Sequence, residues 1–136
     1  MKRVFYTLLV LLMLSACDKL ILKVDGDDAN LQGKWQQTPE DTVFFNFQKN
    51  LFQYQIYVEK DSMKQAYGYY TLNENKTIKL ELLQEHSSFS LDHLGWNTIY
   101  SGNYQDTIYK IFHVDLINSK KMVLSSGNET LNFQKF

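Results

Sequence analysis

Apolar and polar residues alternate with a period of two from Leu31 to the end of the chain, a pattern typical of half-buried β-strands. Residues that favour turns interrupt the alternation about every ten positions. The pattern therefore predicts about eight strands, joined mostly by short turns. Their apolar positions fall around Trp35 and within residues 43–47, 52–58, 66–72, 78–82, 108–116, 122–124 and 131–133.

Consecutive strands with short turns predict an antiparallel meander in an all-β domain. A meander with one apolar face either closes into an up-and-down barrel or folds over as an antiparallel β-sandwich. Closure removes exposed strand edges, which otherwise invite aggregation, and this favours the barrel. We expect an eight-stranded antiparallel up-and-down β-barrel over residues 31–136, with the sandwich as the alternative.

The first residues of the chain follow a different pattern. Lys2 and Arg3 precede an uncharged apolar run over residues 4–14. This run is too short to span a bilayer, since a spanning helix needs about twenty apolar residues. Small residues and then Cys17, the only cysteine of the chain, follow the run. The segment Leu14-Ser15-Ala16-Cys17 resembles the lipobox of bacterial lipoproteins.

The resemblance implies that residues 1–16 are a lipoprotein signal peptide. It also implies that Cys17 becomes the first residue of the mature chain and carries fatty acyl groups such as palmitate. More than one acyl chain gives stable attachment to a membrane of the bacterial cell envelope. Three other interpretations are an ordinary secretory signal peptide, a transmembrane anchor, and a buried N-terminal helix with an incidental cysteine.

Residues 17–30 are expected to be the lipidated cysteine and a flexible tether, and the tether is acidic. Asp25, Asp27 and Asp28 resemble the surface-export signals of some Gram-negative lipoproteins, whereas Asp18 resembles the inner-membrane retention signal of others. These two resemblances conflict. We favour an outer-membrane anchor, with a domain that is periplasmic or surface-exposed.

Gly33-Lys34-Trp35 stands at the start of the first predicted strand. It resembles the Gly-x-Trp motif that opens lipocalins and related calycin barrels, and the resemblance covers about residues 31–136. It implies that Gly33 permits a close backbone approach and that Trp35 plugs one end of the barrel.

One departure from the lipocalin pattern concerns the partner of this tryptophan. Lipocalins commonly stack an arginine of the last strand on it, but the only arginine here is Arg3. Lys135 or Lys121 is therefore the candidate for a weaker cation–π contact.

Aromatic residues make up 15% of the chain, and several fall on the inward faces of the predicted strands. An eight-stranded barrel is just wide enough to pack its own side chains or to hold one small ligand. Two interpretations therefore stay open: these aromatics line an apolar pocket, or they fill the barrel as a core. The inward candidates are Phe45, Phe47, Phe52, Tyr54, Tyr70, Phe112 and Phe133.

The stretch from Gln84 to Asp106 is the one long segment without clear alternation, and loops of this length are often functional. Its large apolar side chains are candidates for a lid over the open end of the barrel. Alternatively, they pack on the outer wall, with a short helix at residues 91–94 and a hairpin at residues 97–104. The lid candidates are Phe89, Leu94, Trp96 and Tyr100.

Charge and polar residues argue against several function classes. Without residues 1–16, Lys+Arg falls from 14 to 12 against 15 Asp+Glu, and a net charge of −3 argues against nucleic-acid binding. His86, His93 and His113 lack the spacing of metal ligands. The serines lack a nucleophile elbow, and no Gly-rich phosphate loop is present. We expect no catalytic residues, no metal and no cofactor.

Together these features predict a membrane-anchored, lipocalin-like lipoprotein that is not an enzyme. Its expected role is to bind a small apolar or amphipathic ligand, with tyrosine hydroxyls, Gln53 or Lys110 holding the polar ends. The alternative is a structural or interaction module with a filled barrel, which acts through its surface or through the 84–106 loop.

Overall fold

The computed structural model describes residues 26–101 and 104–136, which form one antiparallel sheet and two short helices. The predicted signal peptide, Cys17 and the first part of the predicted tether lie outside these residues. The elements are α2 (Gly26–Leu31), β1 (Gly33–Thr38), β2 (Val43–Gln48), β3 (Leu51–Glu59), β4 (Ser62–Leu72), β5 (Thr77–Ser87), η1 (Leu91–Leu94), β6 (Asn97–Ser101), β7 (Tyr104–Ile117), β8 (Lys121–Ser126) and β9 (Glu129–Lys135).

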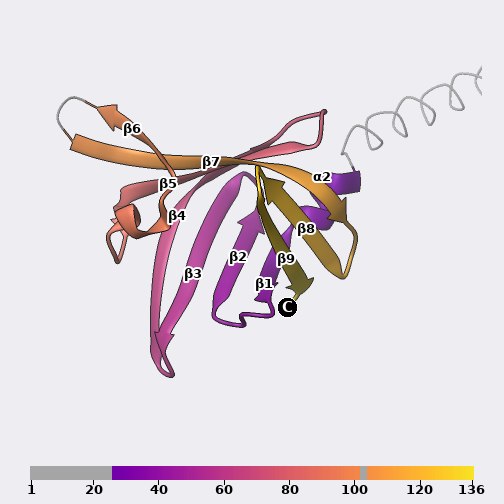
Figure 1. The fold of residues 1–136 in the computed structure, drawn as a ribbon, viewed down its shortest axis with the longest axis horizontal. Coiled ribbons are helices and arrows are strands. Elements are labelled where there is room, and N and C mark those ends of the chain that lie inside the picture. Colours follow the sequence, from indigo (N-terminus) through magenta and orange to yellow (C-terminus); the bar gives the residue numbers. More distant parts are fainter. Residues whose placement is uncertain (1–25, 102–103) are drawn as a thin grey trace, which may run out of the picture.

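Eight of the strands close into a barrel (Figure 1). Neighbours pair antiparallel in the order β5-β4-β3-β2-β1-β9-β8-β7, and β5 pairs in turn with β7. This last pairing sets Leu80 opposite Lys110 and completes the ring. The expected eight-stranded antiparallel barrel is confirmed. The sandwich alternative is wrong, because two stacked sheets would have left β5 and β7 as separate edges.

The ninth strand, β6, lies outside the ring and pairs with the first part of β7, where Asn97 lies opposite Tyr109. It belongs to the stretch that shows no clear alternation in the sequence. The predicted hairpin at residues 97–104 and the predicted short helix at residues 91–94 are both present, as the β6–β7 hairpin and η1.

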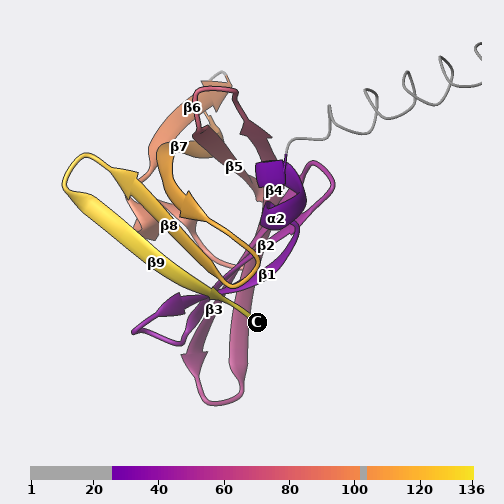
Figure 2. The same cartoon turned by 90° about the vertical axis from the view of Figure 1, so that its right-hand side faces the viewer.

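The two ends of the barrel differ, because successive turns alternate between them. The closed end holds α2 and the turns at residues 49–50, 73–76 and 118–120. At the other end, the mouth, lie the turns at residues 39–42, 60–61 and 127–128 together with residues 88–96, the mouth segment. In Figure 1, α2 is at the right and η1 at the left. In Figure 2, α2 lies beside the β2–β3 turn and away from the β8–β9 turn.

Inward and outward positions alternate along the strands as the sequence predicts. On β5, Ile78, Leu80 and Leu82 are fully buried. The residues between them, Lys79 and Glu81, face outward and form an ion pair at 3.0 Å. Apolar burial on one face therefore fixes the register of the barrel.

Trp35 plugs the closed end. Its side chain is fully buried, and its indole Nε1 donates a hydrogen bond to the Leu31 carbonyl at 2.8 Å. The Lys135 ammonium lies 4.4 Å from the centre of the tryptophan ring and donates to the Asn30 carbonyl at 3.3 Å. Burial lowers the pKa of Lys135. Of the two lysines that the sequence offers for this cation–π contact, Lys135 is the one that makes it.

Gly33 lets Lys135 approach the tryptophan. Its backbone has φ of 110°, and an added Cβ would lie 2.9 Å from the Lys135 Nζ atom. A side chain at this position would therefore strain the backbone and displace the lysine.

The prediction of a flexible tether over residues 17–30 is wrong for residues 26–30, because these residues form most of helix α2. Leu31, the last residue of the helix, is fully buried in the core. The next residue, Gln32, accepts a hydrogen bond from the Lys49 backbone N–H at 2.6 Å. Asp28 lies 3.1 Å from the Tyr70 hydroxyl. These contacts join the start of the described chain to the closed end of the barrel.

Candidate functional site

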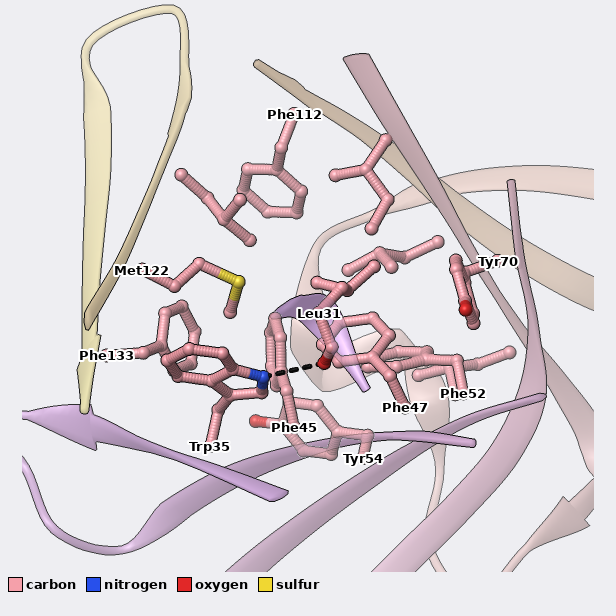
Figure 3. Close-up of a cluster of buried hydrophobic side chains, with 14 of the residues drawn as sticks. Leu31, Trp35, Phe45, Phe47, Phe52, Tyr54, Tyr70, Phe112, Met122 and Phe133 are labelled. Carbon is pink, nitrogen blue, oxygen red and sulfur yellow. Dashed lines mark hydrogen bonds between the residues drawn. The ribbon is translucent and has the colours of Figure 1, made fainter. Parts of the chain in front are cut away.

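Aromatic side chains occupy the interior of the barrel (Figure 3). All seven inward candidates are buried, with exposed fractions from 0% for Phe47 and Phe52 to 7% for Tyr70. The ring centroid of Phe45 lies 4.7 Å from that of Phe133 and 5.1 Å from that of Phe52. Rings at such distances are in direct contact and leave no room for a ligand between them. These side chains pack as a core.

Tyr54 is the member of this set that also lines a groove at the mouth. The groove has a volume of about 400 Å³ and lies between β3, β4 and the mouth segment. We call it the mouth groove. Its lining residues are Tyr54, Ile56 and Val58 of β3, Lys64 of β4, and Phe89, Ser90, His93 and Leu94 of the mouth segment.

Hydrogen bonds hold the mouth segment in place. The Gln84 side chain donates to the Phe89 carbonyl and accepts from the Leu91 backbone N–H, both at 2.9 Å. The Ser88 backbone N–H donates to the Gln65 carbonyl at 2.9 Å. Leu91 is fully buried in the core. One wall of the groove is therefore fixed on both of its neighbouring strands, which lowers the entropy lost when a ligand binds.

Three of the four lid candidates pack on the barrel interior at the mouth. Phe89, Leu94 and Trp96 are partly buried against the core. The Trp96 ring lies 6.5 Å from Phe52 in a stacked arrangement and 6.4 Å from Phe112 in an edge-on one. Both partners face inward, so Trp96 packs against the interior of the barrel and not on its outer wall. The side chain of Tyr100, the fourth candidate, lies outside the described part of the chain.

The mouth groove combines apolar walls with a few polar groups. Tyr54 is 6% exposed, and burial raises the pKa of its hydroxyl to about 12, so it stays protonated at neutral pH. Within the described residues this hydroxyl makes no hydrogen bond to another side chain, which leaves it available to a ligand. Lys64 and His93 are exposed at the rim. None of the lining residues carries a carboxylate.

A second, smaller hollow of about 260 Å³ lies on the outer wall. Around it Leu51, Tyr67 and Tyr69 are exposed by 50%, 44% and 47%, and Gly68, Leu83 and His86 complete the lining. We call this group of six residues the outer-wall patch.

Two polar residues do not take the ligand-facing role expected of them. Gln53 lies on the outer face of β3, where its amide is bonded to Asn46 at 3.2 Å and to Gln65 at 3.0 Å. Lys110 forms an ion pair with Glu129 and does not line the mouth groove. Gln53 follows Phe52 directly, and neighbouring residues of a strand face opposite sides, which explains the first error.

The histidines lie apart from one another. His113 Nδ1 lies 2.8 Å from an Asp115 carboxylate oxygen on the outer face of β7, and this hydrogen bond lowers the pKa of Asp115. Among the described residues, no three His, Cys, Asp or Glu side chains group closely enough to hold a metal ion. In the same part of the chain, no helix is long and apolar enough to cross a membrane.

Ile56, Val58 and Lys64 were not among the predicted site residues. β3 has nine residues and β2 only six, and the last β2 partner on this side is Val43, opposite Ile56. The β3–β4 hairpin therefore extends past β2 at the mouth, which leaves inward positions without a neighbouring strand. The signal was present in the sequence, because the apolar alternation of 52–58 is longer than that of 43–47.

A closed antiparallel barrel of eight strands, plugged at one end by a Gly-x-Trp tryptophan and grooved at the other, is a calycin-type barrel. The family described as "Lipocalin-like domain" matches residues 12–136, and the chain belongs to this lipocalin-like family.

Two solved structures from Bacteroides resemble this barrel. A lipocalin-like protein from Bacteroides uniformis has 25% sequence identity and a TM-score of 0.61, over 79% of this chain and 99% of its own. An uncharacterized protein from Bacteroides eggerthii has 27% identity and a TM-score of 0.57, over 78% and 99% of the two chains. A search of curated proteins finds no match.

Proposed function

We propose that this protein is a lipid-anchored lipocalin-like protein of the bacterial cell envelope that binds a small apolar or amphipathic molecule in the mouth groove. The observation that carries the proposal is a groove of about 400 Å³ with apolar walls and the Tyr54 hydroxyl, which has no side-chain partner among residues 26–101 and 104–136. Ligand sites are typically concave, mostly apolar and supplied with a few polar groups, with volumes of about 300–1,000 Å³.

In this proposal the apolar part of the ligand lies against Ile56, Val58 and Leu94, which removes its surface from water. The Tyr54 hydroxyl bonds a polar group at the inner end, and Lys64 reaches one at the rim. The site binds its ligand without chemical conversion.

The anchor rests on the sequence around Cys17. The basic start, the short apolar run and the small residues before the only cysteine support lipidation. The outer membrane is the favoured membrane, with the barrel periplasmic or surface-exposed. Intact mass measurement of the protein from its host tests this step: a chain that begins at Cys17 with added acyl mass supports it, and an unmodified Cys17 contradicts it.

Native mass spectrometry of the Cys17→Ser chain, purified from its host, tests ligand binding. We expect a bound small molecule that is lost on denaturation, and a rise in melting temperature with members of a fatty-acid and steroid panel. No bound molecule and no shift across the panel would contradict the proposal.

A matched pair of substitutions locates the site. Ser90 lines the mouth groove, is exposed, and makes no capping bond at the start of η1. Ser90→Trp should fill the groove and abolish the thermal shift, because the indole occupies the space of the ligand. Ser119→Trp, in an exposed turn at the closed end, is the control and should leave the shift intact. Equal shifts in both variants would place the ligand elsewhere.

A second candidate function is an interaction module that acts through its surface, and the filled interior favours it. The outer-wall patch is the candidate contact, because its tyrosines are exposed beside a hollow. Tyr67→Ser with Tyr69→Ser should remove crosslinks to an envelope partner while leaving small-molecule binding unchanged. Crosslinks that persist in this double variant would contradict the outer-wall patch as the contact surface.

A further inference from the structure

The exposed charges of the barrel are distributed unevenly between its two ends. The turns of the closed end and the first residue of β8 carry four exposed lysines and one exposed glutamate: Lys49, Lys76, Lys120, Lys121 and Glu74. The mouth carries more exposed carboxylates than exposed lysines, which are Lys60 and Lys64, and Lys110 forms an ion pair with Glu129 there. Its exposed carboxylates include Glu40, Asp41, Glu59, Asp61, Asp92 and Glu129. The two ends of the barrel therefore differ in the sign of their charge.

The chain enters the barrel at the basic end. Helix α2 begins at Gly26 and is fastened to the closed end through Asp28 and Gln32. Eight residues separate Gly26 from Cys17, and even fully extended they reach about 30 Å. A lipid on Cys17 would therefore attach the barrel to the membrane through its closed end, while the length of this segment leaves the orientation to the surface charges of the barrel.

The basic end of the barrel is thus also the end at which the chain enters. We propose that the closed end docks on the anionic lipid surface of the membrane that holds the anchor, with the mouth directed away from the bilayer. The proposal rests on the lipid anchor at Cys17 and goes beyond it, since an anchor alone leaves the barrel free to tumble. Its partner is the anionic headgroup layer, which attracts lysines placed close to it.

Screening by salt limits the distance over which the lipid headgroups act on the charges at each end of the barrel. Charges interact within about 8–10 Å at physiological ionic strength. β8 runs from the closed-end turn to the mouth, and its six residues span about 20 Å. With the closed end down, the mouth carboxylates therefore lie beyond the reach of the headgroups. In a tipped barrel they would be repelled. Asp28 of α2 offsets part of the basic charge, so attraction of the lysines and repulsion of the mouth act together.

This orientation has a consequence for the mouth groove. A groove directed away from the bilayer receives its ligand from the aqueous side, from a carrier or from another envelope protein. It does not take the ligand directly from the membrane to which the protein is attached.

Fluorescence transfer to the membrane tests the orientation. Acylation blocks the single native thiol, so a cysteine introduced into the lipidated chain is the only labelling site. Ser119→Cys labels the closed-end turn and Asn128→Cys labels the mouth turn; both positions are exposed and lie at opposite ends of β8. Each labelled chain is bound to vesicles of phosphatidylcholine with one quarter phosphatidylglycerol that carry an acceptor lipid.

We expect transfer from position 119 to exceed transfer from position 128 by about twofold or more, and the difference to shrink at high salt. The double variant Lys120→Gln with Lys121→Gln should reduce the difference in transfer between the two positions. The matched double variant at the mouth, Lys60→Gln with Lys64→Gln, should leave this difference unchanged or increase it. Equal transfer from both positions, or a larger signal from position 128, overturns the proposal.

Flotation with pure phosphatidylcholine vesicles separates this result from the anchor itself. A lipidated chain floats with these neutral vesicles whatever its orientation. A chain that fails to float has no anchor, and the proposed anchor and the orientation fall together. A chain that floats but shows no difference between the two labels retains its anchor and overturns only the orientation.

Discussion

The closed end and the mouth each hold one of the two tryptophans, and the two side chains are held in different ways. Trp35 is fully buried, hydrogen-bonded to Leu31 and covered by the Lys135 ammonium. Trp96 is only partly buried and is held by ring contacts with core aromatics such as Phe52 and Phe112. Polar and cationic partners fix the Trp35 side chain, whereas ring contacts hold the Trp96 side chain. The difference assigns the larger share of stability to the closed end.

The two tyrosines among the inward candidates repeat this contrast. At the closed end, the Tyr70 hydroxyl accepts from Gln32 and lies within bonding distance of Asp28 and of the Lys49 carbonyl. At the mouth, the Tyr54 side chain is 6% exposed and lines the groove, and its hydroxyl has no such partners among the described residues. A satisfied hydroxyl ties elements together, and an unsatisfied one is available for binding.

The largest expected effect is at the plug. Trp35→Ala should lower the free energy of unfolding by about 3–5 kcal/mol, because it leaves a large cavity and removes the partner of Lys135. Trp96→Ala should cost about half as much, since its site is partly open to solvent and can relax. Urea unfolding measures both. Equal losses at the two positions would contradict the assignment of stability to the closed end.

Most of the barrel could be predicted from the sequence, because its strands bury one face and the alternation records this directly. The segment of Ile78, Leu80 and Leu82 shows how closely the apolar period follows the observed burial. The Gly33 and Trp35 motif likewise predicts, from the sequence alone, which end of the barrel is closed.

Features that depend on contacts between distant residues could not be predicted in this way. Helix α2 forms where Asp28 meets Tyr70, 42 residues away, and no local pattern carries that contact. The mouth groove arises from the different lengths of β2 and β3, which become visible only when the strands are paired. The choice between a filled and a hollow barrel depends on ring distances such as that from Phe45 to Phe133.

A smaller effect is expected from the same substitution at the two tyrosines. Tyr70→Phe should lower the free energy of unfolding by about 1–2 kcal/mol, because Gln32 and the Lys49 carbonyl lose a partner. Tyr54→Phe should change it by less than about 0.5 kcal/mol, since the hydroxyl has no described partner to lose. Urea unfolding at neutral pH measures both changes.

In ligand binding, unlike in stability, Tyr54→Phe should have the larger effect of the two variants. Tyr54→Phe should weaken binding of a ligand that shifts the melting temperature, and Tyr70→Phe should not, since Tyr70 does not line the mouth groove. A destabilised Tyr54→Phe protein with normal binding would show that this hydroxyl serves the fold.

An effect of about 1 kcal/mol is expected at alkaline pH. Burial raises the pKa of Tyr54 from 10.0 to about 12, and burial together with the charge of Asp28 raises that of Tyr70 to about 12. Between about pH 10 and 12 the unfolded chain loses these protons first, so the native state binds more protons and stability falls as pH rises. The stabilisation is complete below pH 10. Wild-type unfolding midpoints from pH 9 to 11.5 should therefore decline more steeply than those of either Phe variant, by about 1 kcal/mol at pH 11 for Tyr54. Parallel curves would show that these hydroxyls titrate alike in the folded and unfolded chains.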